Sequence, residues 1–134
     1  MSIKIKLVVL LLLSVVQIDC KNQGDSTNQV NKIEIIDPAT FKEKSIDQTI
    51  IDIRTPGEYN QGYIEGAINI NYFDKDFLNK ISELDKTKPV FIYCRSGNRT
   101  SSASKKIANL GFEKVYDLQG GILNWSKKNN KIAH

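Results

Sequence analysis

The sequence predicts an α/β fold, in which an open parallel sheet of about five strands carries helices on both faces. Short apolar runs with strand composition alternate with segments of helical spacing along nearly the whole chain. The run from Pro89 to Tyr93 is continuously apolar after its proline, which is typical of a central parallel strand covered on both faces. Glycines such as Gly111 and the pair Gly120-Gly121 mark turns between the segments.

The first half of the predicted domain begins with a strand from Ile33 to Ile36. Asp37 and Pro38 follow it as an N-cap and a first-turn proline, which predicts a short helix through about Lys44. A second strand, a turn with a single helical turn, and a third strand are expected at 50–53, 55–59 and 67–70.

The second half contains two longer amphipathic helices. Apolar residues recur at helical spacing in 74–84 and again in 100–110, so each helix packs one face on the sheet. Gly111 is the expected C-cap of the second of these helices. A fifth strand at 115–118 and a last helix at 122–128 complete the fold, with Trp125 expected in the core.

The stretch from Tyr93 to Thr100 places Cys94 between the end of a strand and the start of a helix. Turn N–H groups and the positive end of the helix point at such a sulfur, and Arg95 and Arg99 add positive charge. Cysteine thiols in settings of this kind have pKa values lowered from about 8.5 to roughly 3.5–7.5. The stretch therefore predicts a nucleophile, and the alternative is an inert cysteine in a core strand.

The N-terminus has the pattern of a secretory signal. Two lysines precede an apolar run of about ten residues that is too short to span a bilayer comfortably. Residues 1–19 are therefore expected to be a signal peptide. Cys20 follows this run as in the lipobox of bacterial lipoproteins, although Asp19 stands where a small residue is usual. Ordinary signal cleavage and an uncleaved anchor are the alternatives.

Lipidation of Cys20 predicts an exported protein, in the periplasm or cell envelope, with a membrane anchor. Residues 20–31 then form the anchor cysteine and a polar, flexible tether, and residues 32–130 form the folded domain. Cys94 would be the only thiol in that domain, so no internal disulfide is expected. One Cys and one His cannot supply a metal site, and no cofactor is expected. A net charge of +4, with scattered lysines, does not indicate a nucleic-acid partner.

Three separated signatures resemble those of rhodanese-like domains, the sulfurtransferase family. The first runs from Asp52 through Arg54 to Glu58-Tyr59 and continues as Gly62-Tyr63-Ile64-Glu65-Gly66-Ala67-Ile68-Asn69-Ile70. The second is the loop from Cys94 to Thr100, and the third is Gly120-Gly121 with Trp125. Together they cover about residues 33–128. Tyr63 stands where the family usually has histidine, a residue that is not its nucleophile.

The resemblance implies that Cys94 takes a sulfane sulfur from a small anionic donor such as thiosulfate. The resulting persulfide would pass the sulfur to cyanide or a thiol. The implied substrate-binding residues are Arg95, Ser96, Gly97, Asn98, Arg99 and Thr100. Asp52, Arg54 and Glu58 are interpreted as structural support, with the two carboxylates orienting Arg54 under the loop.

Other functions of the same fold remain open from the sequence. The related dual-specificity phosphatases of the cell cycle place five residues between Cys and Arg, whereas four residues separate Cys94 from Arg99 here. The shorter loop predicts a tighter ring of N–H donors that suits a sulfur atom better than a phosphate. A non-catalytic binding module, a persulfide carrier and a thiol-redox role are the further alternatives.

Overall fold

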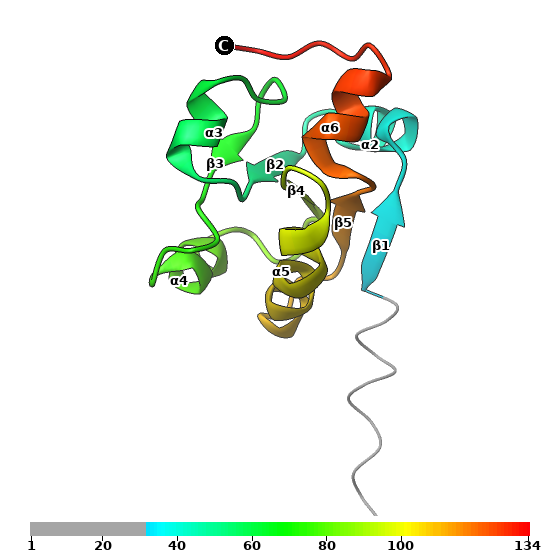
Figure 1. Cartoon of the computed structure of the whole chain (residues 1–134). Coiled ribbons are helices and arrows are strands. Elements are labelled where there is room, and N and C mark those ends of the chain that lie inside the picture. The colour runs from blue at the N-terminus through cyan, green and yellow to red at the C-terminus, as the bar shows by residue number, and fades with distance from the viewer. Residues whose placement is uncertain (1–31) are drawn as a thin grey trace, which may run out of the picture.

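The computed structural model describes residues 32–134, and the predicted signal peptide, Cys20 and tether lie outside this range. The strands are β1 (Ile33–Ile36), β2 (Thr49–Asp52), β3 (Ile68–Asn69), β4 (Val90–Tyr93) and β5 (Val115–Leu118). The helices are α2 (Pro38–Lys44), α3 (Pro56–Asn60), α4 (Phe77–Ser82), α5 (Asn98–Asn109) and α6 (Gly121–Lys127) (Figure 1). The predicted alternation of strands and helices is confirmed, with ends that differ by one to three residues for most elements.

The five strands form one parallel sheet in the order β1-β5-β4-β2-β3. β4 lies between β2 and β5, and all four of its residues are buried. This confirms the prediction of a central strand covered on both faces. In open parallel sheets, sites form at the carboxyl ends of the strands, so the end of β4 is where a site is expected.

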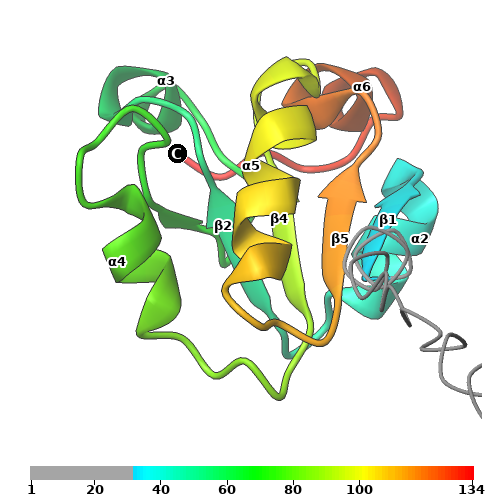
Figure 2. The ribbon, with the colours of Figure 1, turned by 90° about the horizontal axis from the view of Figure 1, so that it is seen from below.

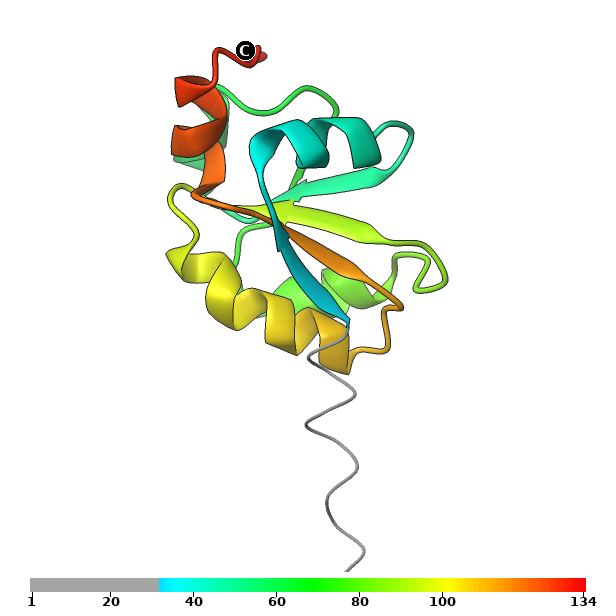
Figure 3. The same cartoon turned by 90° about the vertical axis from the view of Figure 1, so that its right-hand side faces the viewer.

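Helices cover both faces of the sheet, as predicted. Figure 3 shows α2 on one side of the strands and α4 and α5 on the other. The α5 face buries one apolar cluster, in which Ile92, Phe77 and Ile107 take part, and the opposite face buries a second around Phe41, Phe91 and Trp125. Figure 2 shows α3, α6 and the start of α5 at the end of the sheet to which the strands point.

Side-chain caps start the first two helices. The Asp37 carboxylate accepts hydrogen bonds from the N–H groups of Ala39 and Thr40, which satisfies donors that have no partner inside the helix. Thr55 and Glu58 form a reciprocal capping box at the start of α3. Within residues 32–134, no helix is long and apolar enough to cross a membrane.

Candidate active site

The site is built on the loop that connects β4 to α5. Cys94 follows the last residue of β4 and is 1% exposed. The N–H of Gly97 donates a hydrogen bond to its Sγ at 3.1 Å. Gly97 adopts a φ of 99°, which a residue with a side chain rarely reaches, and it is the N-cap of α5. The turn therefore brings both a backbone donor and the positive end of a twelve-residue helix to the sulfur.

Helix α6 packs against this loop and donates hydrogen bonds to its backbone. The N–H groups of Ile122 and Leu123 donate to the carbonyl oxygens of Cys94 and Arg95, at 3.0 and 3.2 Å. Gly121 has a φ of 61°, and a Cβ added there would collide with the same two carbonyl groups. The glycine pair of the third sequence signature thus permits α6 to approach the loop closely.

The two arginines of the loop have different surroundings. Arg95 is exposed at the protein surface. Arg99 is partly buried and forms two hydrogen bonds with Glu58, at 2.8 and 2.7 Å. These bonds to the Arg99 guanidinium, which outweigh the opposing effect of burial, lower the pKa of Glu58 to about 2. Glu58 therefore balances most of the positive charge of Arg99 within the protein.

The predicted cluster of Asp52, Arg54 and Glu58 forms only in part. Arg54 donates from Nε and Nη2 to the Asp52 carboxylate, and both residues are buried. Glu58 does not join them, because α3 directs it to Arg99 instead. Arg54 also donates to the carbonyl oxygen of Gly62 at 2.7 Å. The expectation that both acidic groups orient Arg54 under the reactive loop is wrong, since Arg54 supports the Gly62 turn.

Tyr63, which replaces the usual histidine of the first signature, lies in the same turn. Its ring stacks on Tyr59, with centroids 4.2 Å apart. Its backbone exchanges hydrogen bonds with Ala133, at 3.0 and 2.8 Å. Through these contacts Tyr63 packs against α3 and the C-terminal segment.

Thr100 lies beside the Cys94 sulfur, and the neighbouring strand β5 carries a buried carboxyl group that was not predicted. The hydroxyl of Thr100 lies 3.8 Å from the sulfur and donates to the carbonyl oxygen of Gly97. Asp117 on β5 is a buried carboxyl group that sequence reasoning missed, and burial raises its pKa to about 6. The available signal was an acidic residue inside the apolar run 115–118, which burial on a central strand makes costly.

Aromatic residues after β3 lie near the loop. Phe73 is 65% exposed, and the Arg99 guanidinium carbon lies 5.8 Å from its ring centre. Tyr72 packs on Phe77 and accepts a hydrogen bond from Lys106 at 3.1 Å. Phe73 is therefore the aromatic side chain placed to meet a molecule that approaches Arg99.

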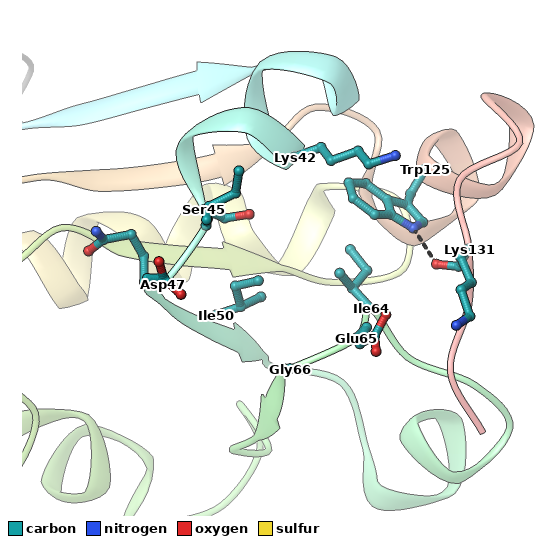
Figure 4. A pocket seen from close by; sticks show the side chains of 11 residues that line it. Lys42, Ser45, Asp47, Ile50, Ile64, Glu65, Gly66, Trp125 and Lys131 are labelled. Atoms are coloured by element: carbon teal, nitrogen blue, oxygen red, sulfur yellow. Dashed lines mark hydrogen bonds between the residues drawn. The ribbon is translucent and has the colours of Figure 1, made fainter.

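A hollow of about 410 Å³ (Figure 4) lies beside the cluster of Phe41, Phe91 and Trp125. Cys94 belongs to the cluster on the opposite face of the sheet. The apolar part of the hollow is formed by Ile50, Ile64 and Trp125, and no residue of the loop 94–100 lines it. Trp125 is in the core, as predicted, and its indole N–H donates to the carbonyl oxygen of Lys131. The hollow is thus separate from the thiol site.

The arrangement around Cys94 suits a nucleophile that forms a covalent intermediate. The sulfur has a backbone donor, a hydroxyl neighbour and a helix N-terminus, and it is shielded from bulk water. Within residues 32–134, no group of three or more metal-ligating side chains is present. The contacts of the sulfur with the Gly97 N–H and the Thr100 hydroxyl favour chemistry carried by the thiol.

Comparison with known proteins finds a match to the family described as "Rhodanese-like domain" over residues 37–128. The thiosulfate sulfurtransferase GlpE of Shewanella oneidensis is 30% identical over 101 residues, which span 68% of this chain and 98% of the relative. A tRNA uridine(34) hydroxylase of Pelagibacter ubique is 35% identical over 99 residues, which span 72% of this chain. This chain spans only about a third of the length of that hydroxylase, 33%.

The fold is also shared with solved structures. A rhodanese-related protein of Thermoplasma volcanium superposes with a TM-score of 0.68 at 28% sequence identity. The superposition covers 75% of this chain and 97% of the other. The five-stranded parallel sheet with helices on both faces is therefore an architecture that related proteins also adopt.

Proposed function

This chain belongs to the family of rhodanese-like domains, and on that premise we propose that it is a sulfurtransferase that carries sulfur as a persulfide on Cys94. The observation that carries the proposal is the hydrogen bond from the Gly97 N–H to the Cys94 sulfur, inside a loop that starts α5. An anionic sulfur is stabilised by such a donor and by the helix N-terminus. The four-residue spacing between Cys94 and Arg99 supports a sulfur substrate over a phosphate.

In the first half-reaction the Cys94 thiolate attacks the outer sulfur of a donor such as thiosulfate. A new S–S bond forms to Cys94, the S–S bond of the donor breaks, and sulfite leaves with the electron pair. In the second half-reaction a thiolate or cyanide attacks the outer sulfur of the persulfide, and the Cys94 thiolate leaves. Each half-reaction moves one sulfur atom, so no net redox partner is needed.

The two arginines of the loop have different proposed roles. Arg95 is exposed and is the guanidinium we expect to meet the anionic donor. Arg99 already forms two hydrogen bonds to Glu58, so we assign it the holding of the loop against α3. This assignment differs from the expectation that Arg95 and Arg99 both bind the donor.

Mass spectrometry of the intact protein tests the persulfide. The full chain with Cys20→Ser retains Cys94 as its only cysteine, and it is incubated with and without thiosulfate. We expect the mass to rise by one sulfur atom, and we expect no rise when Cys94→Ser is added. Circular dichroism of both proteins checks that the fold is kept. An unchanged mass with thiosulfate and with other sulfane donors would contradict the proposed function.

We also propose that the protein is exported and anchored to a membrane through lipid on Cys20. The support is the charged and apolar N-terminal pattern that precedes this cysteine. Fractionation of cells that express the full chain tests this proposal, and recovery of the protein in the cytosolic fraction would contradict it.

A further inference from the structure

The charged side chains around the reactive loop are of one sign. Residues 94–112, which hold the loop and α5, contain basic side chains and no acidic one, and the same is true of residues 119–134, which hold α6. The basic residues are Arg95, Arg99, Lys105, Lys106, Lys127, Lys128 and Lys131. Figures 2 and 3 show α6 beside the start of α5, with the loop between them. The two segments that frame the loop are therefore positively charged.

The carboxylates of the neighbouring elements already have basic partners. Glu58 of α3 pairs with Arg99, and Asp74 and Asp76, which precede α4, lie 3.4 and 3.3 Å from the amine of Lys80. Arg95 is exposed, and within residues 32–134 it takes part in no salt bridge. Arg95 therefore offers its charge to a negatively charged molecule that reaches the loop.

Exposed apolar side chains flank the loop on two sides. Leu123 is 43% exposed, and its N–H donates to the carbonyl oxygen of Arg95 at 3.2 Å, so it lies beside the beginning of the loop. Phe73 is 65% exposed and lies beside the end of the loop, where its ring faces the Arg99 guanidinium. Exposed apolar side chains gathered around a charged centre are typical of surfaces that bind another molecule.

The sulfur lies deeper than these side chains. Cys94 is 1% exposed, whereas Arg95 and Ser96 are exposed directly after it. A small anion such as cyanide can reach the sulfur without contacting Phe73 or Leu123. A cysteine within a polypeptide has a short side chain, so the residues on either side of it must contact the rim of the loop when its sulfur enters.

We propose that Phe73, Arg95 and Leu123 form an acceptor surface, which binds a protein whose reactive cysteine is flanked by apolar and acidic residues. The apolar residues would pack on Phe73 and Leu123, and the acidic ones would meet Arg95 and the basic segments around it. A protein is favoured over a nucleic acid, because leucine has no ring for base stacking and RNA carries no thiol.

The inference rests on the proposed function and names the class of its acceptor. The thiolate of the acceptor attacks the outer sulfur of the Cys94 persulfide, and a new S–S bond forms. The bond between the outer sulfur and Cys94 breaks, and the Cys94 thiolate leaves with the electron pair. The acceptor departs as a persulfide, so atoms and electrons balance without an oxidant.

Transfer to short peptides tests the acceptor surface. The full chain with Cys20→Ser is loaded with thiosulfate, freed of excess donor and mixed with cyanide or with a peptide thiol. One peptide has a central cysteine with leucines beside it and glutamates beyond them. A second has lysines in place of the glutamates, and a third has serines in place of the leucines. With rate constants corrected for the thiolate fraction, we expect the first peptide to react about tenfold faster than the others. Its advantage over the lysine peptide should shrink at high salt.

Variants of the surface sharpen this test. Phe73→Ser and Leu123→Ser should each lower the rate constant for the first peptide, relative to that for cyanide, by about fivefold. Ile46→Ser is the matched control, because Ile46 is 66% exposed and lines the hollow beside Trp125. It should leave the ratio unchanged. Circular dichroism checks that each variant keeps the fold.

Equal rate constants for the three peptides, or for the first peptide and free cysteine, would overturn the inference. A dimer that Leu123→Ser converts to a monomer, seen by light scattering, would also overturn it, because a second copy would then cover the surface. Stronger inhibition of the transfer by a short RNA than by the first peptide with serine for cysteine would do the same.

Binding without transfer separates this inference from the proposed function. Fluorescence anisotropy of the labelled peptides with the unloaded protein needs no sulfur donor, and it should show the tightest binding for the first peptide. A chain that takes sulfur from thiosulfate but passes it equally to every peptide would leave the proposed function standing and the acceptor surface disproved.

Discussion

Two buried carboxyl groups lie on the strands at either side of β4, and they differ in their hydrogen-bond partners. Asp52 on β2 lies opposite Tyr93, and Asp117 on β5 lies opposite Ile92. Asp52 is 0% exposed, and both of its oxygens accept hydrogen bonds from Arg54. Asp117 is 4% exposed, but one of its oxygens has no partner among the described residues.

The difference separates a carboxyl group that stabilises the fold from one that costs stability when it is charged. A buried ion pair with every lone pair used is rigid, and removing one partner leaves an uncompensated charge. A buried carboxyl group with an unused oxygen is instead held at a cost, because burial disfavours its charged form. The Asp52 side of β4 therefore holds the turns in place, whereas the Asp117 side carries a buried carboxyl group that lowers stability when it ionises.

Breaking the Asp52 pair should have the largest effect. Arg54→Met keeps much of the apolar volume but strands a buried carboxylate, so we expect a loss of about 3–5 kcal/mol in the free energy of unfolding. Urea unfolding followed by circular dichroism measures it. The double variant with Asp52→Asn should recover part of the loss. A loss below about 1 kcal/mol would show that the pair is not the support inferred here.

Neutralising Asp117 should instead raise the free energy of unfolding, by an amount that depends on pH. The pKa of Asp117 is raised from 3.8 to about 6, so the folded state binds the proton more tightly than the unfolded state. The carboxyl group therefore lowers stability increasingly as the pH rises from 3.8 to about 6, and fully above that. Two pKa units correspond to about 3 kcal/mol, the upper limit of the gain expected for Asp117→Asn.

Unfolding at acidic and at mildly alkaline pH measures this gain. We expect Asp117→Asn to be more stable than the parent protein at pH 8 and to lose most of that advantage at about pH 3, since the parent carboxyl group is mostly protonated in both states at the lower pH. An equal effect at both values would mean that packing of the amide, not the charge, accounts for it.

Breaking the partly buried pair of Glu58 and Arg99 should have the smallest effect. Glu58→Gln should cost at most about 1 kcal/mol, because partly exposed ion pairs contribute little. In the parent protein this contribution is present above pH 4.5 and is lost as the pH falls towards about 2, the lowered pKa of Glu58. Glu34→Gln, which breaks the exposed pair with Lys114, is the matched control away from the loop.

The two glutamate variants should differ in activity and not in stability. Glu58→Gln frees Arg99 at the loop, so we expect kcat/KM for sulfur transfer to fall, whereas Glu34→Gln should leave it unchanged. Equal kcat/KM values for the two variants would remove Glu58 and Arg99 from the positioning of the loop.

Local chemistry explains why much of the fold could be predicted from the sequence. Asp37 and Pro38 specify the start of α2 through a cap and a fixed φ, and the structure places both there. The apolar run before Cys94 specifies a central strand, and the glycine of the following turn specifies the start of a helix. These features depend on neighbours within a few residues, so periodicity and turn chemistry are sufficient to find them.

The partners of the charged groups could not be predicted in the same way. Glu58 and Arg99 are 41 residues apart, and their contact depends on how α3 and α5 pack at the end of the sheet. Glu58 is four residues from Arg54 in the sequence, and that proximity favoured the wrong partner.

The sequence by itself determined the alternation of strands and helices, the loop from Cys94 to Thr100 and the family resemblance, because each is a pattern of neighbouring residues. Only the tertiary structure decided that Asp52 is paired, that Glu58 meets Arg99, and that Asp117 is buried with one oxygen unpartnered among the described residues. The physical reason is that a carboxyl group's environment is set by strand order and helix packing, which bring together residues far apart in the chain.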